Sequence, residues 1–293
     1  MGEIRGTTQT ESLLLRPEVP ILMRPGDKIQ FGIVADRCLV LPLPQGIQPG
    51  PIFQSLLAAQ RGHCLVEQLE KHQVPTSFVT ALVADLQDAG LVIAPVIDRI
   101  ITIVGRDSLR TRIYETLRHN RQHTHVIARA PSRHTLEWLS SAPVERIGLV
   151  LLTGMEVPNL HIVRVLFNRG IAHLSTHFRD GVLTMGPYCE PRKKSRNLKT
   201  MPAPQSACPV CIENHRIDHD AARGTLALQM RTYVPHTAPQ WVTPATGVVV
   251  SKLRHSHLNE FVGAQVSIDL DALEISRAEF APHPRCSVCG YHY

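Results

Sequence analysis

The sequence predicts an α/β protein in two parts, a winged-helix-like unit at residues 1–93 and a sheet-based domain at residues 94–293. Three observations predict this class. Short alternating segments separated by turns come first and are followed by helical stripes. Beyond Pro95, buried strands alternate with helices, which is typical of an open parallel sheet with helices on both faces. Two Cys-x-x-Cys pairs near the C-terminus indicate a structural zinc site.

The first part of the chain combines a small antiparallel meander with three helices. Turn signals such as Pro25-Gly26-Asp27 separate segments in which apolar and polar residues alternate. Strands are expected at residues 21–23, 28–33 and 38–41, and helices near residues 52–57, 65–72 and 75–89. Two short helices followed by a longer one are typical of winged-helix folds.

The second part alternates between strands and helices. A β-branched run at residues 100–105 predicts a buried parallel strand. Further strands are expected at residues 126–128, 147–152 and 171–174, and helices at residues 109–117 and 158–169. Residues 181–207 contain several Gly and Pro residues and are expected to form a long loop. Helices near residues 210–220, 224–230 and 245–255 and a hairpin at residues 264–270 and 274–280 complete the domain.

Composition and charge exclude several classes of protein. The 293 residues are 43% hydrophobic and 19% charged, which excludes wholesale disorder. No apolar run reaches the ~18 residues of a membrane-spanning helix, and residues 1–12 lack the pattern of a secretory signal, so we expect a cytoplasmic protein. The net charge of +6 is spread along the chain apart from a basic run at residues 192–196, and aromatic residues make up only 5%, so no nucleic-acid partner is expected.

The strand that ends at Gly105 lies where nucleotide-binding folds place their phosphate loop. Such a loop needs glycines, because backbone amides must approach the phosphates closely. Only Gly105 is present here, and the side chains of Arg106 and Asp107 follow it. Neither a GxGxxG motif nor a P-loop lysine pattern occurs in the chain. The second part is therefore interpreted as a degenerate Rossmann-like domain that binds no nucleotide.

Four of the seven cysteines form two closely spaced pairs, Cys208 with Cys211 and Cys286 with Cys289. A Cys-x-x-Cys turn lets both thiolates reach one ion, and two such turns supply the four sulfurs of a tetrahedral zinc site. Four sulfurs leave no position for water, so the expected cofactor is a structural Zn²⁺ that attaches the C-terminal tail to the core. No basic residue that would activate Cys189 is identifiable, and no catalytic residue is expected.

These features together resemble the ThiF-like proteins of ribosomal-peptide biosynthesis, which are related to ubiquitin-activating enzymes. The residues that carry the resemblance are the strand ending at Gly105, the Gly186-Pro187 segment, Cys208-Pro-Val-Cys211 and His283-Pro-Arg-Cys-Ser-Val-Cys289. The resemblance covers nearly the whole chain, and the N-terminal unit is similar to the peptide-recognition element of such pathways. The four cysteines match the zinc positions of the family.

The resemblance implies a noncatalytic scaffold that binds a precursor leader peptide and presents it to a YcaO-type cyclodehydratase, in the biosynthesis of azoline-containing microcins. A ThiF-like adenylyltransferase that uses ATP and magnesium is the alternative, although no adenylation residue carries over onto the loop after Gly105. A winged-helix DNA-binding regulator is disfavoured, because residues 76–89 contain no Lys or Arg but do contain Asp85 and Asp88. Assembly of the chain as a homodimer is left open.

Leader capture is expected to occur by addition of a strand to an exposed sheet edge. Pro42 and Pro44 favour an edge position for the strand at residues 38–41, because proline cannot donate to a sheet ladder. The candidate peptide-binding residues are Cys38, Leu39, Val40 and Leu41 on this strand and Phe78, Leu82 and Asp85 on the helix that forms the other wall.

Overall fold

The chain divides into two compact units, residues 1–96 and residues 97–293. The computed structural model describes residues 13–93, 99–119, 124–190, 206–231, 233, 236–254 and 258–289. The basic run at residues 192–196 lies outside the described residues. Each unit has an apolar core of its own.

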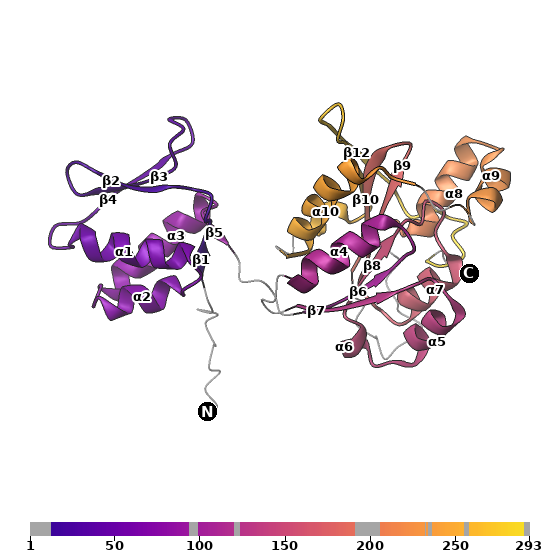
Figure 1. Ribbon diagram of the computed structural model, residues 1–293, viewed down its shortest axis with the longest axis horizontal. Helices are drawn as coiled ribbons and strands as arrows, with labels where there is room; N and C mark the ends of the chain where they lie inside the picture. Colours follow the sequence, from indigo (N-terminus) through magenta and orange to yellow (C-terminus); the bar gives the residue numbers. More distant parts are fainter. Residues whose placement is uncertain are drawn as a thin grey trace. The chain divides into compact units, whose positions relative to one another are not determined.

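The first unit is a three-stranded antiparallel sheet with three helices (Figure 1). Its sheet consists of β2 (Ile21–Arg24), β3 (Lys28–Phe31) and β4 (Leu39–Pro42), and its helices are α1 (Pro49–Gln60), α2 (Leu65–Lys71) and α3 (Thr76–Asp88). Every strand and helix expected in this part of the chain is present. The structure adds a short pair that the sequence analysis does not predict, in which β1 (Leu14–Leu15) lies beside β5 (Val92–Ile93).

Strand alternation builds the core of this unit. Ile21, Phe31 and Leu39 lie side by side across the three strands, and Ile29 and Leu41 form the next inward-facing row. These side chains pack in one apolar cluster with the buried faces of the three helices. The cluster includes Ile52, Leu56, Leu65, Leu69, Val79, Leu82 and Leu86.

The second unit contains a seven-stranded mixed sheet in the order β12-β11-β10-β9-β8-β6-β7. The strands β6 (Arg99–Val104), β7 (Thr124–Arg129), β8 (Leu149–Thr153) and β9 (His173–Arg179) are parallel. The strands β10 (Val182–Cys189), β11 (Ala264–Asp269) and β12 (Glu274–Glu279) extend the sheet through antiparallel pairs. The prediction of a parallel sheet holds for β6 to β9 and is wrong for the rest of the sheet, where β9 and β10 form a hairpin and β11 pairs antiparallel with β10. The predicted hairpin at residues 264–270 and 274–280 is present as β11 and β12.

The expected loop at residues 181–207 is wrong in its first part, because residues 182–189 form β10 inside the sheet. A two-residue turn joins β9 to β10, and its residues Asp180 and Gly181 have φ angles of 50° and 87°. Positive φ at both positions matches the right-handed twist of a tight hairpin. The Asp-Gly pair is therefore a hairpin signal that the sequence analysis missed.

Gly186 shows why β10 contains a residue that is typical of loops. Its φ is 102°, and a Cβ at this position would overlap the carbonyl oxygen of Ala264 on β11. Glycine is needed here because two backbones approach each other closely.

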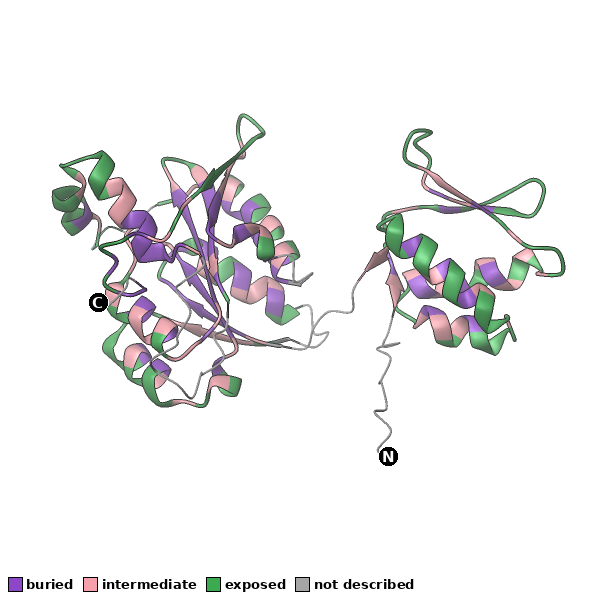
Figure 2. Ribbon diagram, turned by 180° about the vertical axis from the view of Figure 1, so that it is seen from behind, coloured by how far each residue is buried: buried purple, intermediate pink, exposed green. Residues whose placement is uncertain are grey.

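Helices cover both faces of the parallel half of the sheet, as predicted (Figure 1). Helices α4 (Ser108–His119) and α10 (Pro239–Arg254) pack on one face, and α5 (Arg133–Ser141), α7 (Leu160–Asn168) and α8 (Pro209–His219) pack on the other. The described residues also form the helices α6 (Val144–Ile147) and α9 (Arg223–Met230) and the 3-10 helix η2 (Asn259–Phe261). Strand β8 is buried along its whole length, so its apolar run has no polar alternation (Figure 2).

The strand expected at residues 147–152 is β8, which begins at Leu149, two residues after the predicted start. Ile147 ends helix α6, which the sequence analysis does not predict, and Gly148 turns the chain with a φ of 65°. Within the described ranges, no helix has both the length and the apolar character needed to cross a membrane.

Candidate functional site

The two cysteine pairs meet at the start of helix α8. Cys208 precedes the helix and Cys211 lies in its first turn, and Pro209 begins the helix at a position where its missing amide hydrogen costs nothing. The second pair lies in a turn near the C-terminus, in which the Cys286 amide donates to the carbonyl of His283 at 3.0 Å. Local chain geometry therefore places the two thiols of each pair close together, and the fold brings the two pairs together.

The four sulfur atoms form a compact cluster, and all lie within 4.8 Å of one another. Sγ of Cys208 is 3.8 Å from Sγ of Cys211 and 3.6 Å from Sγ of Cys286. Four sulfurs at about 2.3 Å from a tetrahedral zinc ion lie about 3.8 Å apart. The cluster fits such an ion, and all four cysteines are buried. The sequence prediction that these residues converge is confirmed.

Side chains of α8 hold the second cysteine turn in place. Nε2 of His283 donates to Asp218 at 2.9 Å, and Arg285 pairs with the same carboxylate. These hydrogen bonds lower the pKa of Asp218. His215 donates from Nε2 to the carbonyl of Ala281 at 2.9 Å. His215 and His283, which lie near the cysteines, thus help to attach the tail to α8.

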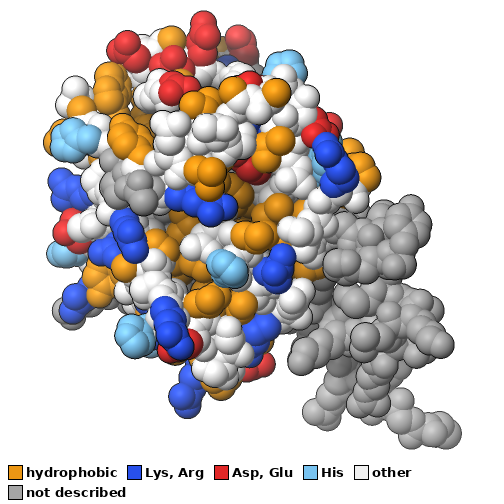
Figure 3. All heavy atoms as spheres, turned by 90° about the vertical axis from the view of Figure 1, so that its right-hand side faces the viewer, with side chains coloured by type: hydrophobic (Ala, Val, Ile, Leu, Met, Phe, Trp, Pro, Cys, Tyr) orange, Lys and Arg blue, Asp and Glu red, His pale blue; other side chains and the backbone are white. Residues whose placement is uncertain are grey.

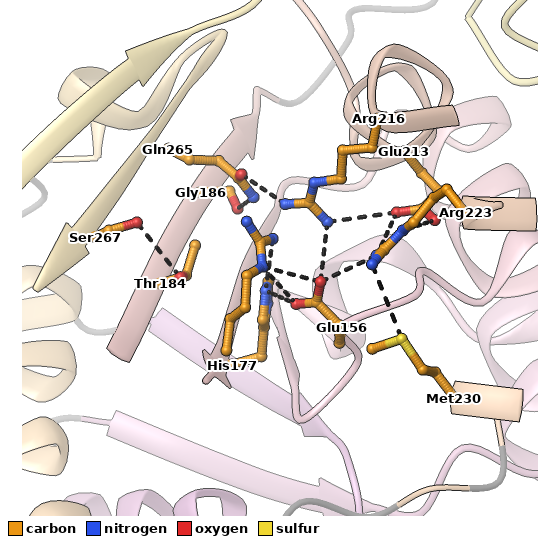
Figure 4. Close-up of polar contacts among 11 residues, drawn as sticks. Glu156, His177, Thr184, Gly186, Glu213, Arg216, Arg223, Met230, Gln265 and Ser267 are labelled. Carbon is orange, nitrogen blue, oxygen red and sulfur yellow. Dashed lines mark hydrogen bonds and ion pairs between the residues drawn. The ribbon is translucent and has the colours of Figure 1, made fainter. Parts of the chain in front are cut away.

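A network of buried charges lies beside the cysteine helix, around Glu156 (Figure 4). Glu156 follows β8, and its carboxylate accepts hydrogen bonds from His177 at 2.7 Å and from Arg179 at 2.9 Å. Arg216 of α8 and Arg223 of α9 also donate to it, at 3.3 Å and 3.0 Å. The network joins two strand ends to the two helices that follow the cysteines.

Charge pairing decides the ionisation of Glu156. Burial alone would raise the pKa of this carboxyl, but the hydrogen bond and charge of His177, together with those of Arg179, outweigh burial and lower the pKa to about 2. Glu156 is therefore ionised at neutral pH. The sequence analysis did not identify this network, because its members come from four separate parts of the fold, namely the segment after β8, strand β9 and helices α8 and α9.

The carboxyl ends of β6, β8 and β9 border a hollow of about 660 Å³. Figure 3 shows this side of the second unit, with hydrophobic side chains in a hollow and cationic and histidine side chains around it. The lining includes Phe178, Trp241, Arg106, Arg179 and Arg231. Strands β7 and β8 lie on opposite sides of β6, so this is the switch point at which open α/β sheets bind ligands.

Asp107 occupies the place that a phosphate would need at this switch point. Its buried carboxylate accepts hydrogen bonds from the Arg110 amide in the first turn of α4 at 3.2 Å and from the Thr153 hydroxyl at 2.8 Å. Burial raises the pKa of Asp107, and the hydrogen bond from Thr153 opposes this rise. The start of α4 is thus already capped by an acidic side chain.

Gly105 has a packing role in the same place. A Cβ at Gly105 would overlap the Thr153 side chain on β8, so the two strand ends approach more closely than any other residue permits. The close approach of the two strands is therefore sufficient to explain why a glycine is needed at position 105, and no bound phosphate is required for this explanation.

In the first unit, β4 is an edge strand of the sheet, as expected from its prolines. The Leu43 amide donates to the Asp27 carbonyl on the neighbouring side. Because ladder bonds alternate along an antiparallel strand, Leu41 and Leu39 also bond towards β3, and the amide of Val40 faces the free edge.

The other predicted peptide-binding residues lie at β4 and on helix α3, which packs against α2 and β5 in the same unit. Leu41 and Leu82 are buried in the same apolar cluster, and Leu39 and Phe78 pack against it. Asp85 is exposed on α3, and Cys38 is half-buried. Phe78, Leu82 and Asp85 are spaced to lie on one face of the helix.

No family model matches the chain, and no curated protein matches its sequence. Several solved structures match its fold. The heterocyclase TruD aligns with a TM-score of 0.54 and 12% identity over 95% of this chain and 43% of its own. A heterocyclase in complex with substrate and cofactor aligns with a TM-score of 0.55 and 11% identity over 96% of this chain and 39% of its own. E. coli MccB with MccA aligns with a TM-score of 0.50 and 12% identity over 96% and 100% of the two chains.

The chain has the fold of these E1-like proteins. It spans about two fifths of the length of the heterocyclase chains and matches MccB over its whole length. The predicted resemblance to ThiF-like proteins of azoline and microcin biosynthesis is thereby confirmed as a similarity of structure. The second unit contains the seven-stranded mixed sheet and the clustered cysteines.

Proposed function

We propose that the chain is a noncatalytic scaffold that binds the leader of a precursor peptide and presents it to a YcaO-type cyclodehydratase. The observation that carries the proposal is the free edge of β4, with the Val40 amide directed outward beside an apolar cluster. The E1-like fold supports it, because MccB with MccA and heterocyclases such as TruD share this fold. We assign ATP-dependent azoline formation to the partner enzyme.

The leader would add a fourth strand to the sheet. Its backbone would accept a hydrogen bond from Val40, and its inward-facing apolar side chains would lie near Leu39 and Leu41. The half-buried Phe78 of α3 would form the opposite wall, and Leu82, which is buried in the core, would support Phe78 from behind. Asp85, exposed on the same helix face, would accept a hydrogen bond or a cationic side chain of the leader. Main-chain pairing would supply affinity, and the apolar wall would supply specificity.

Zinc would be held by Cys208, Cys211, Cys286 and Cys289 in a structural role. When bound, the ion would cross-link helix α8 to the C-terminal turn, and four thiolates would fill its coordination positions. Its contribution would be to the stability of the second unit, because metal binding is coupled to folding.

An adenylyltransferase is the second candidate function, favoured by the hollow of about 660 Å³ at the switch point. The Asp107 carboxylate argues against an adenylyltransferase. This carboxylate already accepts a hydrogen bond from the Arg110 amide of α4, which a phosphate would need, and its negative charge would repel a phosphate. We therefore expect calorimetry to detect no binding of Mg-ATP at sub-millimolar concentrations. Saturable binding of Mg-ATP, or pyrophosphate exchange that depends on a peptide carboxylate, would contradict the scaffold proposal and support the adenylyltransferase.

Leader binding tests the proposed function itself. A fluorescein-labelled leader from a precursor gene adjacent to that of this chain is titrated with the full-length protein, and its anisotropy is expected to rise to saturation. A scrambled leader of the same composition is the matched control and is expected to bind more weakly. The precursor is also incubated with the YcaO-type enzyme, with and without this chain. Mass spectrometry is expected to show loss of water from the precursor only when the chain is present. Absence of binding, or equal binding of the scrambled peptide, would contradict the proposal.

A further inference from the structure

Among its buried and half-buried side chains, the charge network around Glu156 carries one more positive than negative charge; the carboxylate of Asp220, at the same hollow, is exposed to water and is not counted. Arg179, Arg216 and Arg223 contribute three positive charges, and the side chains of Glu156 and Glu213 contribute two negative charges. Both carboxylates are only 8% exposed. A surplus cation that is partly removed from water attracts an anion more strongly than a solvated surface charge does.

The carboxylate of Glu156 already accepts several hydrogen bonds at each of its oxygens. Oε1 of Glu156 accepts from Arg179, Arg216 and Arg223 at 2.9, 3.3 and 3.0 Å. Oε2 accepts from His177 at 2.7 Å and from Arg179 at 3.0 Å. Glu213 accepts from both Arg216 and Arg223. Glu156 therefore has no acceptor left for the terminal N–H groups of Arg179.

Arg179 has N–H groups that donate to no carboxylate of the network. Nε of Arg179 donates to Glu156, and neither terminal nitrogen of Arg179 lies within hydrogen-bond distance of a carboxylate in the described part of the chain. Nη2 lies 3.3 Å from Nε2 of His177, but that nitrogen donates its own hydrogen to Glu156 and cannot accept. The Arg179 side chain is 31% exposed, so its free N–H groups are accessible to a ligand.

These donors border an open hollow of about 420 Å³ in the second unit. Its walls include Arg179, Arg216, Arg223, His215, His219 and Phe280. The planar guanidinium fork matches a carboxylate geometrically, and Phe280 offers an apolar surface to the stem of an acidic side chain. Asp220 lies at the same hollow and would repel a phosphate, with a charge of about −1.5 to −2, more than a singly charged carboxylate.

We propose that this hollow is a carboxylate-binding site for an acidic side chain of a polypeptide partner, with Arg179 as its principal donor. The site belongs to the second unit and does not depend on leader capture by β4. Arg216 and Arg223 would contribute mainly by fixing Glu156 and Glu213, so that the surplus charge remains at Arg179.

The test uses full-length protein and a fluorescein-labelled hexaglutamate peptide, with hexaglutamine as the uncharged control. Hexaglutamate is expected to bind, and Arg179→Gln is expected to weaken this binding about tenfold, the loss of one charge-assisted hydrogen-bonded contact. Arg112→Gln makes the same change of net charge on the exposed face of α4 and is expected to bind as the wild type does. Arg179→Lys, which keeps the charge but loses the fork, is expected to fall between the two.

Tryptophan fluorescence during urea unfolding checks that each variant is folded, because Trp138 and Trp241 both lie in the second unit. Equal affinity of the wild type and a folded Arg179→Gln for hexaglutamate would overturn the proposal, as would equal binding of hexaglutamine. Inorganic pyrophosphate distinguishes the source of the anion. Tighter binding of pyrophosphate than of hexaglutamate would identify a phosphate site and reject the acidic peptide.

Discussion

Replacing Cys286 by serine is expected to remove the bound zinc and to destabilise the second unit by several kcal/mol. Sγ of Cys286 lies 3.6 Å from that of Cys208 and 3.5 Å from that of Cys289, so its loss opens the sulfur cluster on two sides. Structural zinc sites contribute about 10 kcal/mol or more of binding free energy, and this free energy is also folding free energy. Elemental analysis is expected to give about one zinc per wild-type chain.

Cys64→Ser is the matched control for this change. Cys64 lies in the first unit at the start of α2, outside the sulfur cluster. The control is expected to keep the zinc and the wild-type urea midpoint, as followed by the fluorescence of Trp138 and Trp241. A wild-type protein without metal, or a Cys286→Ser variant with full zinc content and unchanged midpoint, would refute the metal centre.

Glu156→Ala is expected to lower the free energy of unfolding of the second unit by about 3 kcal/mol, because it leaves the cations of Arg179, Arg216 and Arg223 short of a carboxylate. Glu137→Ala is the control. Glu137 pairs with Arg133 on the surface of α5, and loss of such an exposed pair costs about 1 kcal/mol or less. Urea unfolding followed by tryptophan fluorescence measures both values, and equal losses for the two variants would contradict the role given to the network.

The same network predicts a dependence on pH. The pKa of Glu156 falls from 4.5 to about 2 in the folded state, so folding favours the ionised form. The stabilisation is complete above pH 4.5 and is lost as the pH falls towards 2. The stability of the wild type is therefore expected to decrease over this range more steeply than that of Glu156→Ala. Parallel decreases would show that Glu156 is not the titrating group.

The cysteine cluster could be predicted because the information is local. Two thiols three residues apart must share a turn, and two such turns supply the four sulfurs that a tetrahedral metal site needs. The strands of the first unit were predictable for a similar reason, since Pro25-Gly26-Asp27 and Pro42 mark turns and edges within a few residues.

Strand β10 was mispredicted because local signals conflicted there. Gly186 and Pro187 are typical of loops, yet Gly186 accommodates the close approach of Ala264 from a strand that lies almost eighty residues further along the chain. The turn at Asp180 and Gly181 carried the opposing signal. Weighing that pair of residues more heavily would have predicted the hairpin of β9 and β10.

The Glu156 network lay beyond sequence reasoning for a different reason. Its partners His177, Arg216, Arg223 and Gln265 come from separate strands and helices, and no spacing in the sequence relates them. The partial signal was an acidic residue just beyond a buried strand, where the ends of parallel strands gather polar groups. Its arginine partners could be identified only after the fold had placed α8 and α9 beside β9.

The scaffold account depends most directly on the free edge of β4, and one amide tests it. Val40→Pro removes the hydrogen-bond donor that faces the edge, while Val40→Thr keeps the donor and remains well suited to a strand. Edge strands tolerate proline, so both variants are expected to fold, with circular dichroism and the zinc content of the second unit as checks.

Fluorescence anisotropy of the labelled leader, titrated with the wild type, Val40→Pro and Val40→Thr, is the deciding measurement. The account predicts that Val40→Pro binds at least about tenfold more weakly than the wild type, because one ladder bond is lost and the added strand is displaced, while Val40→Thr binds as the wild type does. Equal affinities for the wild type and a folded Val40→Pro would contradict binding at this edge.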